Sequence, residues 1–220
     1  MPGAPCGPGA AGMPPCRLVL FDFDGTLADS FAFFAGVFDA VARRHGLAPL
    51  AAADLPALRR MPVAAALAHI GIPRWKLPAV ARDLVARMRE DGQGVRLFDG
   101  IGAALDGLAS RGLALGVVSS NARDNVLRTL GPRHAAQFRY IECGMSVFGK
   151  APRIRRILRQ AGCAPREALF VGDTESDLEA ARAAGVPFGA VAWGYGDAAS
   201  PAMRAADRGF RMVDALHGIA

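Results

Sequence analysis

One stretch constrains the fold of this chain more than any other. Residues 21–27 have the sequence Phe-Asp-Phe-Asp-Gly-Thr-Leu, and they follow an apolar Leu-Val-Leu run at residues 18–20. The apolar run predicts a short buried strand. Because side chains alternate along a strand, Asp22 and Asp24 are expected to point one way while the aromatic residues pack inward. Gly25 then permits a sharp turn. Carboxylates at the end of a parallel strand predict a site for chemistry at that edge of the sheet.

Two neighbouring carboxylates also predict a metal site, because a hard cation such as Mg²⁺ prefers oxygen ligands. A solvated acidic turn is the alternative, but such a turn does not need an aspartate on each side of a buried aromatic residue. The four histidines are scattered, and the four cysteines lack zinc-ligand spacing (Cys6, Cys16, Cys143 and Cys163). We therefore expect carboxylate ligands, free thiols and a reducing, cytoplasmic location.

Length and composition bound the architecture. A chain of 220 residues predicts one domain, or one domain with an insertion. Mean hydropathy is +0.22, yet no uninterrupted apolar run reaches the length of about 20 residues that spans a membrane. We expect a soluble protein with no membrane partner. Residues 1–15 are rich in Gly, Pro and Ala and lack the basic start of a secretory signal, so they predict a disordered tail, with Met13 as an alternative start.

The charge is strongly basic, with a formal net charge of +6 and a pI near 9.8. Nearly all basic residues are arginine, and lysine occurs only at Lys76 and Lys150. This indicates an arginine-leaning composition rather than a specialised surface, and we expect no nucleic-acid partner. The arginines between residues 153 and 159 could form a nucleic-acid patch, but a solvated helix face is the favoured interpretation. A basic surface would also steer anionic substrates.

The segment from residue 28 to residue 97 carries no strand pattern and predicts a block of helices. Phe31, Phe34, Phe38 and Val41 recur at the spacing of one helical face, and a basic end follows at residues 43–45. Further helices are expected at residues 54–59, 62–70 and 77–90, the last with Val80, Leu84, Val85 and Met88 facing inward.

From Phe98 onward, helices and strands alternate. Buried strands are expected at residues 113–118, 138–143, 168–171, 188–193 and near 210–213. Helices are expected at residues 101–110, 123–130, 152–161 and 176–184, with two short helices near the end. Ser120 or Asn121 is expected to cap the helix at 123–130. This alternation predicts an α/β protein with a doubly wound parallel sheet.

More polar residues lie where these strands end. Ser119 closes the strand at 113–118, where a hydroxyl and the N–H groups of a helix start can hold a phosphate oxygen. Asp173 follows the strand at 168–171, and Asp177 lies one helical turn later on the same side. Lys150 is retained where arginine is the rule, which suggests a compact point charge. It ends a G-x-x-x-x-G-K pattern, but Ala151 stands where a nucleotide-binding loop needs Ser or Thr.

Together these motifs resemble the four motifs of the haloacid dehalogenase (HAD) superfamily, in the same order. Residues 22–26 resemble the D-x-D-G-T motif, Ser119 the second motif, Lys150 the third, and residues 172–177 the G-D-x-x-x-D motif. The stretch Ala-Trp-Gly-Tyr-Gly at residues 192–196 resembles the phosphoglycolate phosphatase-like group. The resemblance implies a Rossmann-like core domain from residues 16–29 and 98–220, with an inserted α-helical cap domain at residues 30–97.

The resemblance also implies a reaction, a Mg²⁺-dependent hydrolysis of a small phosphorylated metabolite. Asp22 would attack phosphorus, and Asp24 would serve as general acid and then general base. The implied metal ligands are the Asp22 carboxylate, the Asp24 backbone carbonyl, Asp173 and Asp177. The implied phosphate ligands are Gly25, Thr26, Ser119, Ser120 and Lys150.

Two questions stay open at this stage. Arg59 and Arg60 could bind a substrate carboxylate or second phosphate, or could be the solvated end of a helix. A phosphomutase of the β-phosphoglucomutase type shares all four motifs and is the alternative function. A non-catalytic binding protein is disfavoured by the intact motif residues, and Asp24 disfavours a dehalogenase or a P-type ATPase. The oligomeric state, monomer or dimer, is not indicated.

Overall fold

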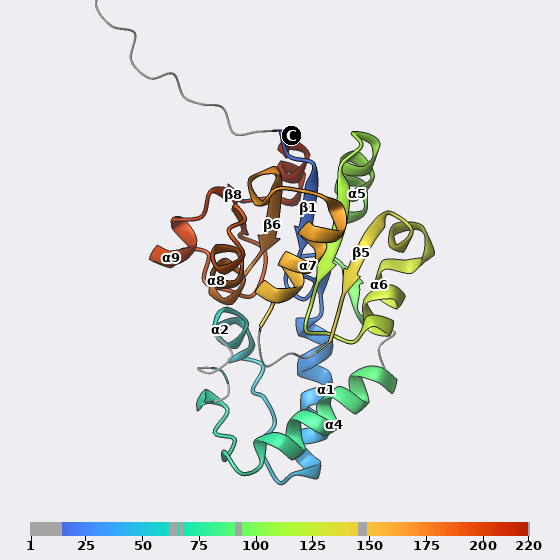
Figure 1. The fold of residues 1–220 in the computed structure, drawn as a ribbon. Helices are drawn as coiled ribbons and strands as arrows, with labels where there is room; N and C mark the ends of the chain where they lie inside the picture. The colour runs from blue at the N-terminus through green and yellow to red at the C-terminus, as the bar shows by residue number, and fades with distance from the viewer. Residues whose placement is uncertain (1–14, 62–65, 67, 91–93, 145–148, 220) are drawn as a thin grey trace, which may run out of the picture.

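The computed structural model describes residues 15–61, 66, 68–90, 94–144 and 149–219. Its centre is a sheet of six strands in the order β5-β4-β1-β6-β7-β8, and every neighbouring pair is parallel (Figure 1). The strands are β1 (Leu18–Phe21), β4 (Ala114–Val118), β5 (Phe138–Glu142), β6 (Ala168–Gly172), β7 (Phe188–Val191) and β8 (Arg208–Phe210). The predicted α/β fold with a parallel sheet is confirmed.

Alternation along β1 divides the core into two layers. Val19 and Phe21 pack on one face of the sheet, where α5 (Ile101–Ser110), α6 (Arg123–Ala135) and the C-terminal 3-10 turn at residues 213–218 lie. Leu18 and Leu20 pack on the other face, under α7 (Ala151–Ala161), α8 (Glu175–Ala184) and α9 (Pro201–Arg204). Helices on both faces leave the carboxyl edge of the sheet exposed for a site.

The helical segment between β1 and α5 begins and ends at one point. β2 (Ala28–Asp29) pairs antiparallel with β3 (Arg96–Leu97), so the chain leaves the core and returns side by side. These strands correct the expectation that residues 28–97 contain none. Each has two residues, which is too short to produce a period-2 pattern in the sequence.

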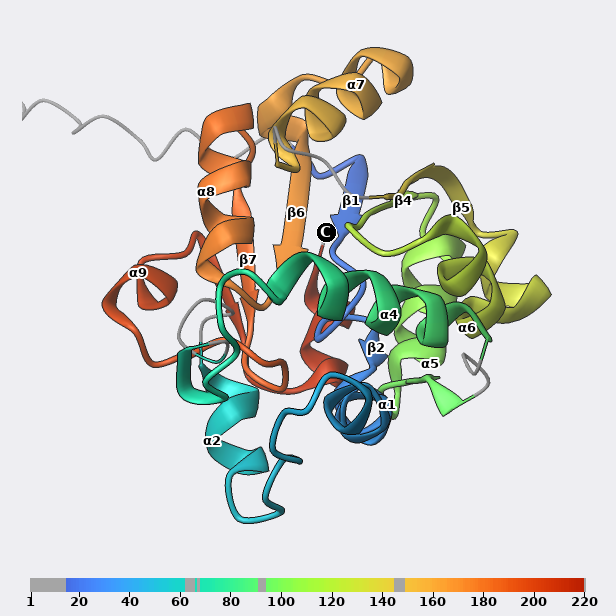
Figure 2. The same cartoon turned by 90° about the horizontal axis from the view of Figure 1, so that it is seen from below.

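The segment contains α1 (Phe31–Arg44), α2 (Leu55–Arg60) and α4 (Leu77–Glu90), which lie below the carboxyl edge of the sheet (Figures 1 and 2). Helices α1 and α4 share a small core in which Phe38, Val41 and Val80 are buried. The segment therefore has its own apolar centre, and its treatment as a cap domain with bounds at residues 30 and 97 stays a prediction.

Several local expectations are refined. Helix α1 ends in Arg43 and Arg44 as predicted. Asp54 stands at the start of α2 without a capping hydrogen bond from its side chain. The inward side chains expected at 84, 85 and 88, and most of the helix expected at 62–70, lie outside the described residues.

Two boundaries after β4 differ more. Helix α6 starts after Ala122, not after a Ser120 or Asn121 cap, and it continues to Ala135 across a break at Gly131. Gly131 has a φ of 66°, and Pro132 follows it, so a second short helix can begin there. The last strand lies at Arg208–Phe210, slightly before the extended segment expected at 210–213.

Candidate active site

Three central strands deliver polar side chains to one edge. Asp22 follows β1 and extends its ladder, since its N–H donates to Val171 at 2.8 Å. Ser119 follows β4 and donates its N–H to Glu142 at 2.9 Å. Asp173 follows β6. Because these strands are parallel, their ends converge, and the three side chains are all buried.

Asp22, Asp173 and Asp177 form a compact carboxylate cluster. One oxygen from each lies within 4.8 Å of the others. Asp173 and Asp177 are fully buried, and Asp22 is only 6% exposed. The ammonium of Lys150, at the start of α7, lies 2.6 Å from both Asp22 and Asp177. The structure thus gathers four residues that are up to 155 positions apart in the sequence.

The electrostatics of the cluster show an excess of negative charge. Burial, and then the neighbouring Asp177, raise the pKa of Asp173 to about 6. Burial also raises the pKa of Asp22 well above its ordinary value, with Asp177 adding to the effect and Lys150 opposing it. Burial disfavours the charged form of Lys150, but Asp22 and Asp177 outweigh it and raise the lysine pKa, so its ammonium stays charged.

This donor set fits a hard divalent cation. Three carboxylates face one ammonium, and no histidine or cysteine belongs to the described cluster. If all three carboxylates ionise, two negative charges remain uncompensated in a buried site, which is the condition that a divalent ion with oxygen ligands relieves. The expected ligands Asp22, Asp173 and Asp177 therefore lie together, while the side chain of Asp24 points elsewhere.

Asp24 faces the start of the helical segment. Its carboxylate accepts a hydrogen bond from the Ser30 hydroxyl at 2.7 Å and two from the Asn121 amide at 3.1 and 3.2 Å. Burial raises its pKa, while the bonds from Ser30 and Asn121 oppose the rise. A carboxyl group with a raised pKa is suited to proton transfer near neutral pH. Neither Ser30 nor Asn121 was expected here; Asn121 carried only a helix-cap signal, and Ser30 carried none.

The turn after Asp24 is held by its own hydrogen bonds. Thr26 donates its hydroxyl to Asp173 at 3.1 Å, and the N–H of Gly25 donates to Ala28 at 2.9 Å. Gly25 has a φ of 85°, and a Cβ at this position would overlap the Asp173 carboxylate. The turn therefore requires glycine. The predicted phosphate contacts of Gly25 and Thr26 stay predictions.

The Trp-Gly-Tyr stretch after β7 closes the other side of the turn. The indole of Trp193 donates to the carbonyl of Thr26 at 3.0 Å, and the N–H of Tyr195 donates to Asp173 at 2.8 Å. A Cβ on Gly194 would overlap Asp173 and the carbonyl of Gly25. Sequence reasoning marked this stretch only as a group resemblance, whereas in the fold it supports two site residues.

Ser119 and Ser120 occupy the end of β4. The Ser119 side chain is fully buried, and its hydroxyl accepts the N–H of Asn121 at 2.9 Å. Ser120 is exposed. Ser119 therefore lies at the same sheet edge as Asp22, as its position in the sequence predicts, and the phosphate contacts of both serines stay predictions.

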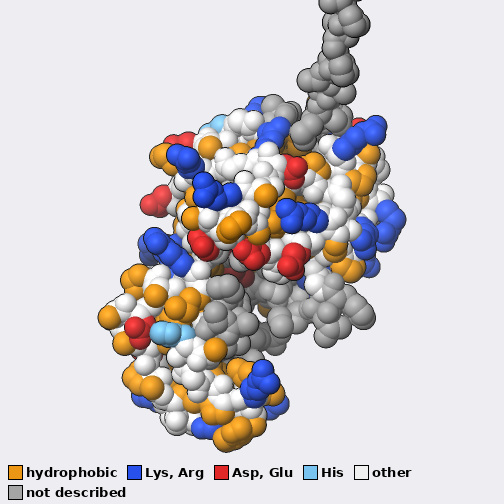
Figure 3. Space-filling view, turned by 90° about the vertical axis from the view of Figure 1, so that its left-hand side faces the viewer, with side chains coloured by type: hydrophobic (Ala, Val, Ile, Leu, Met, Phe, Trp, Pro, Cys, Tyr) orange, Lys and Arg blue, Asp and Glu red, His pale blue; other side chains and the backbone are white. Residues whose placement is uncertain are grey.

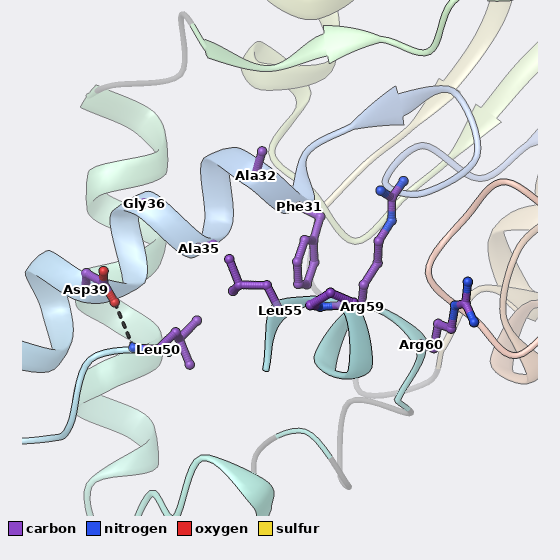
Figure 4. A pocket seen from close by; sticks show the side chains of 10 residues that line it. Phe31, Ala32, Ala35, Gly36, Asp39, Leu50, Leu55, Arg59 and Arg60 are labelled. Carbon is purple, nitrogen blue, oxygen red and sulfur yellow. Dashed lines mark hydrogen bonds between the residues drawn. The ribbon is translucent and has the colours of Figure 1, made fainter. Parts of the chain in front are cut away.

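The two arginines of α2 differ. Arg59 reaches back to the core: it donates to the carbonyl of Trp193 at 3.3 Å, lies 3.7 Å from Asp29, and stacks 5.5 Å from the Tyr195 ring. Arg60 is exposed, and its side chain runs toward the loop after β7 (Figure 4). Both line a cavity of about 600 Å³ with residues of α1, and one of about 390 Å³ with residues 192–194 and 196–199.

The three cysteines among the described residues take no part in the site. Cys16, Cys143 and Cys163 are free thiols, and Cys6 lies outside the described residues. Burial raises the pKa of Cys143 to about 11, so its thiolate is scarce at neutral pH.

Basic side chains on the face in Figure 3 are scattered among acidic ones rather than joined in one stripe. Within the described residues, no helix is long and apolar enough to cross a membrane.

Comparison with known sequences decides the family. The family described as "haloacid dehalogenase-like hydrolase" matches residues 19–191, which include every motif at the sheet edge. The chain belongs to this family. Its curated relatives are named as phosphatases, and the chain is a phosphoric monoester hydrolase.

This HAD-like hydrolase has curated relatives of similar length. A phosphoglycolate phosphatase of Synechococcus elongatus is 30% identical over 184 residues, covering 82% of this chain and 86% of the relative. A phosphoglycolate phosphatase of Xanthomonas campestris is 32% identical over 193 residues, covering 81% and 84%. An N-acetylmuramic acid 6-phosphate phosphatase of Pseudomonas aeruginosa is 29% identical over 189 residues, covering 81% and 83%.

Solved structures of the family share the fold. A haloacid dehalogenase-like hydrolase from Streptococcus pneumoniae superposes with a TM-score of 0.80 at 20% identity, covering 92% of this chain and 97% of that one. CbbY from Rhodobacter sphaeroides, solved in complex with phosphate, gives a TM-score of 0.70 at 21% identity, covering 91% and 96%. At these identities the likeness supports the fold.

Proposed function

We propose that this HAD phosphatase hydrolyses a small phosphate monoester through an aspartyl phosphate on Asp22. The main support is the buried carboxylate cluster that pairs with Lys150. Asp24 lies outside this cluster, and its carboxyl group is bonded by the Ser30 hydroxyl instead. Two carboxyl groups in contrasting environments at one edge can serve as nucleophile and as acid–base. The family match over residues 19–191, which contain Asp22, Asp24, Lys150 and Asp173, supports the same assignment.

The reaction has two balanced steps. In the first, an oxygen of Asp22 attacks phosphorus, the phosphorus–oxygen bond of the ester breaks, and the leaving oxygen takes the proton of Asp24. In the second, water attacks the phosphoryl group, Asp24 takes a proton from that water, and the bond to Asp22 breaks. Asp22 and Asp24 return to their starting forms and inorganic phosphate leaves. Lys150 and Ser119 would hold phosphoryl oxygens through both steps.

Asp22, Asp173, Asp177 and the backbone carbonyl of Asp24 are the proposed holders of Mg²⁺. The ion would neutralise phosphoryl charge and keep Asp22 ionised, since without it the pKa of Asp22 is raised by burial and by Asp177. Thr26 and Tyr195 orient Asp173 by donating to its two oxygens, and Thr174 orients Asp177 by donating its hydroxyl at 2.5 Å. This support for the ligands favours one fixed geometry.

The proposed substrate class is a small carboxylic acid that carries a phosphate monoester, with 2-phosphoglycolate as the first candidate. The named substrates of the relatives, phosphoglycolate and N-acetylmuramic acid 6-phosphate, share this combination. Arg60 supplies an exposed guanidinium on the helical segment that lies against the sheet edge, and a guanidinium can bind a carboxylate in bidentate fashion. An enclosing insertion also favours small metabolites over phosphoproteins.

A matched pair of esters tests the substrate class. 2-Phosphoglycolate and 2-hydroxyethyl phosphate have the same two-carbon chain and differ in that the first ends in a carboxylate and the second in a neutral hydroxymethyl group. We expect kcat/KM to be at least about tenfold higher for the acid, the value of one well-placed charged contact. Equal values would contradict the substrate class. Release of inorganic phosphate with no bisphosphate activator separates hydrolysis from the phosphomutase alternative.

A further inference from the structure

The start of α1 is capped from the far end of the chain. Ser30 is the residue before α1, yet its side chain makes no capping hydrogen bond to the helix. Instead the phenol oxygen of Tyr195 accepts the N–H groups of Ser30 and Phe31, at 2.6 and 2.9 Å. The first N–H groups of a helix need such acceptors. Tyr195 therefore supplies the acceptor for the N–H groups at the very start of α1, which precede the second and third helical N–H groups that a capping serine ordinarily accepts.

The Ser30 hydroxyl makes no bond to the helix and serves Asp24 instead. The hydroxyl donates to the carboxylate of Asp24 at 2.7 Å and lies 3.1 Å from the phenol oxygen. The phenol has one proton to donate, to the Ser30 hydroxyl or to the carbonyl of Ala28 at 3.2 Å. With two acceptor positions filled and one donor used, the hydroxyl of Tyr195 is fully satisfied.

The same tyrosine also contacts the helical segment and the core. Its ring lies 5.8 Å from the ring of Phe31 and 5.5 Å from the guanidinium of Arg59. Its backbone N–H donates to Asp173. One residue thus joins the first turn of α1, helix α2, the carboxylate cluster and, through Ser30, the carboxyl group of Asp24.

We propose that Tyr195 and Ser30 are positioning residues that register the start of the helical insertion with the carboxyl group of Asp24. The proposal rests on the acid–base role given to Asp24 in the proposed function. When α1 is held on the phenol oxygen, the Ser30 hydroxyl is held where it orients Asp24. A displacement of α1 moves that hydroxyl and with it the proton that Asp24 delivers. The position of the insertion thereby controls how well Asp24 delivers its proton to the leaving oxygen.

The test uses the full chain and Tyr195→Phe, which keeps the ring and removes only the hydroxyl. The measured quantity is kcat/KM, which reports the steps up to release of the alcohol. For 2-hydroxyethyl phosphate, whose alkoxide needs a proton to leave, kcat/KM should fall about tenfold because the acid is misplaced. For p-nitrophenyl phosphate, whose phenolate leaves unaided, it should change less than about twofold. Ser30→Ala should show the same pattern, and Ser30→Thr should restore the alkyl ester.

Tyr140→Phe is the matched control, because Tyr140 is the other tyrosine of the chain and lies in β5 away from the site. It should leave both esters unchanged. If Tyr195→Phe and Ser30→Ala lower both esters by the same factor, or neither, the proposal is overturned. Asp24→Asn, measured in parallel, separates the positioning proposal from the acid–base role of Asp24. If the loss of activity in Asp24→Asn does not depend on the leaving group, the acid–base role itself has failed.

Discussion

The carboxyl edge of the sheet and the helical surface that faces it are built in opposite ways. At the edge, Asp22, Asp173 and Asp177 are buried, and each is held by hydrogen bonds or by Lys150. On the insertion, the cavity beside α1 and α2 is lined mostly by apolar residues, and Arg60 is exposed. A fixed polar edge suits a reaction common to all esters, whereas an open surface with few charges suits a choice among them.

This contrast between the sheet edge and the insertion predicts different effects for mutations in the two regions. Changes at the edge should slow every ester through the chemical steps. Changes on the insertion should act on particular substrates, mainly through KM. Arg59 stands between the two, because it belongs to α2 but bonds to Trp193 and lies beside Asp29 in the core. Mutation of Arg59 is therefore a direct test of whether the two regions act differently.

Asp22→Asn is expected to have the largest effect. The amide cannot attack phosphorus, so p-nitrophenyl phosphate and 2-phosphoglycolate should both lose activity by at least about 10⁴-fold, with no trapped phosphoenzyme. Steady-state rates and mass spectrometry of quenched protein measure this. An Asp22→Asn variant that still forms phosphoenzyme would show that another residue is the nucleophile.

Asp24→Asn should be the next largest, with a loss on the order of 10²–10⁴-fold in each proton transfer. p-Nitrophenyl phosphate should give a burst, because phosphorylation of Asp22 needs little protonation while hydrolysis needs the base. An alkyl phosphate should give no burst and almost no turnover. Stopped-flow burst amplitude is the measurement. Equal slowing of both esters without a trapped intermediate would reassign the two aspartates.

Arg60→Ala should act on one substrate class. We expect KM for 2-phosphoglycolate to rise about tenfold, with little change for p-nitrophenyl phosphate, because only the first carries a carboxylate. Arg43→Ala, an exposed arginine at the end of α1, is the matched control for the loss of one positive charge. If Arg43→Ala has the same effect, the arginine acts through general attraction and not as a subsite.

Arg59→Ala should raise KM less and lower stability more, because Arg59 bonds to the core. The loss of its hydrogen bond and of its stacking on Tyr195 should lower the free energy of unfolding by about 1 kcal/mol. Thermal unfolding of the three arginine variants compares them. Unchanged stability in Arg59→Ala together with a large KM effect would move Arg59 into the substrate site.

The smallest expected effect is on the pH dependence of stability. The folded pKa of Asp173 is raised to about 6 from an ordinary 3.8. In metal-free protein this group therefore stabilises the fold below pH 3.8, and the contribution is lost as the pH rises through 6. If Mg²⁺ binds the ionised cluster as proposed, the rise in Tm that it produces should be larger at pH 8 than at pH 5. A shift in Tm that is independent of pH would contradict Mg²⁺ binding at these carboxylates.

Much of the edge was predictable because each motif is local. A strand end followed by Asp-x-Asp-Gly-Thr, or by Gly-Asp with a second aspartate one turn later, places its side chains by backbone geometry alone. Parallel strands then bring those ends together, and the structure gathers Asp22, Asp173 and Asp177 in one cluster, with Lys150 paired to Asp22 and Asp177. The parallel sheet itself followed from the alternation of helices and strands after residue 98.

Other features depended on residues that meet only in the folded chain. The two-residue strands β2 and β3 have no period of their own and exist because residues 28 and 97 are brought together. Asn121 had the signature of a helix cap, but its amide bonds to Asp24 across the edge.

The sequence by itself determined the order of the motifs, the α/β sheet and the carboxylates that belong to its edge, because these rest on backbone periodicity and short spacing. The tertiary structure decided that Tyr195, 165 positions away from Ser30, accepts the N–H groups at the start of α1. It also decided that Arg59 bonds to the core while Arg60 stays exposed. Neighbouring arginines are alike in sequence, and only the packing of α2 against the loop after β7 distinguishes them.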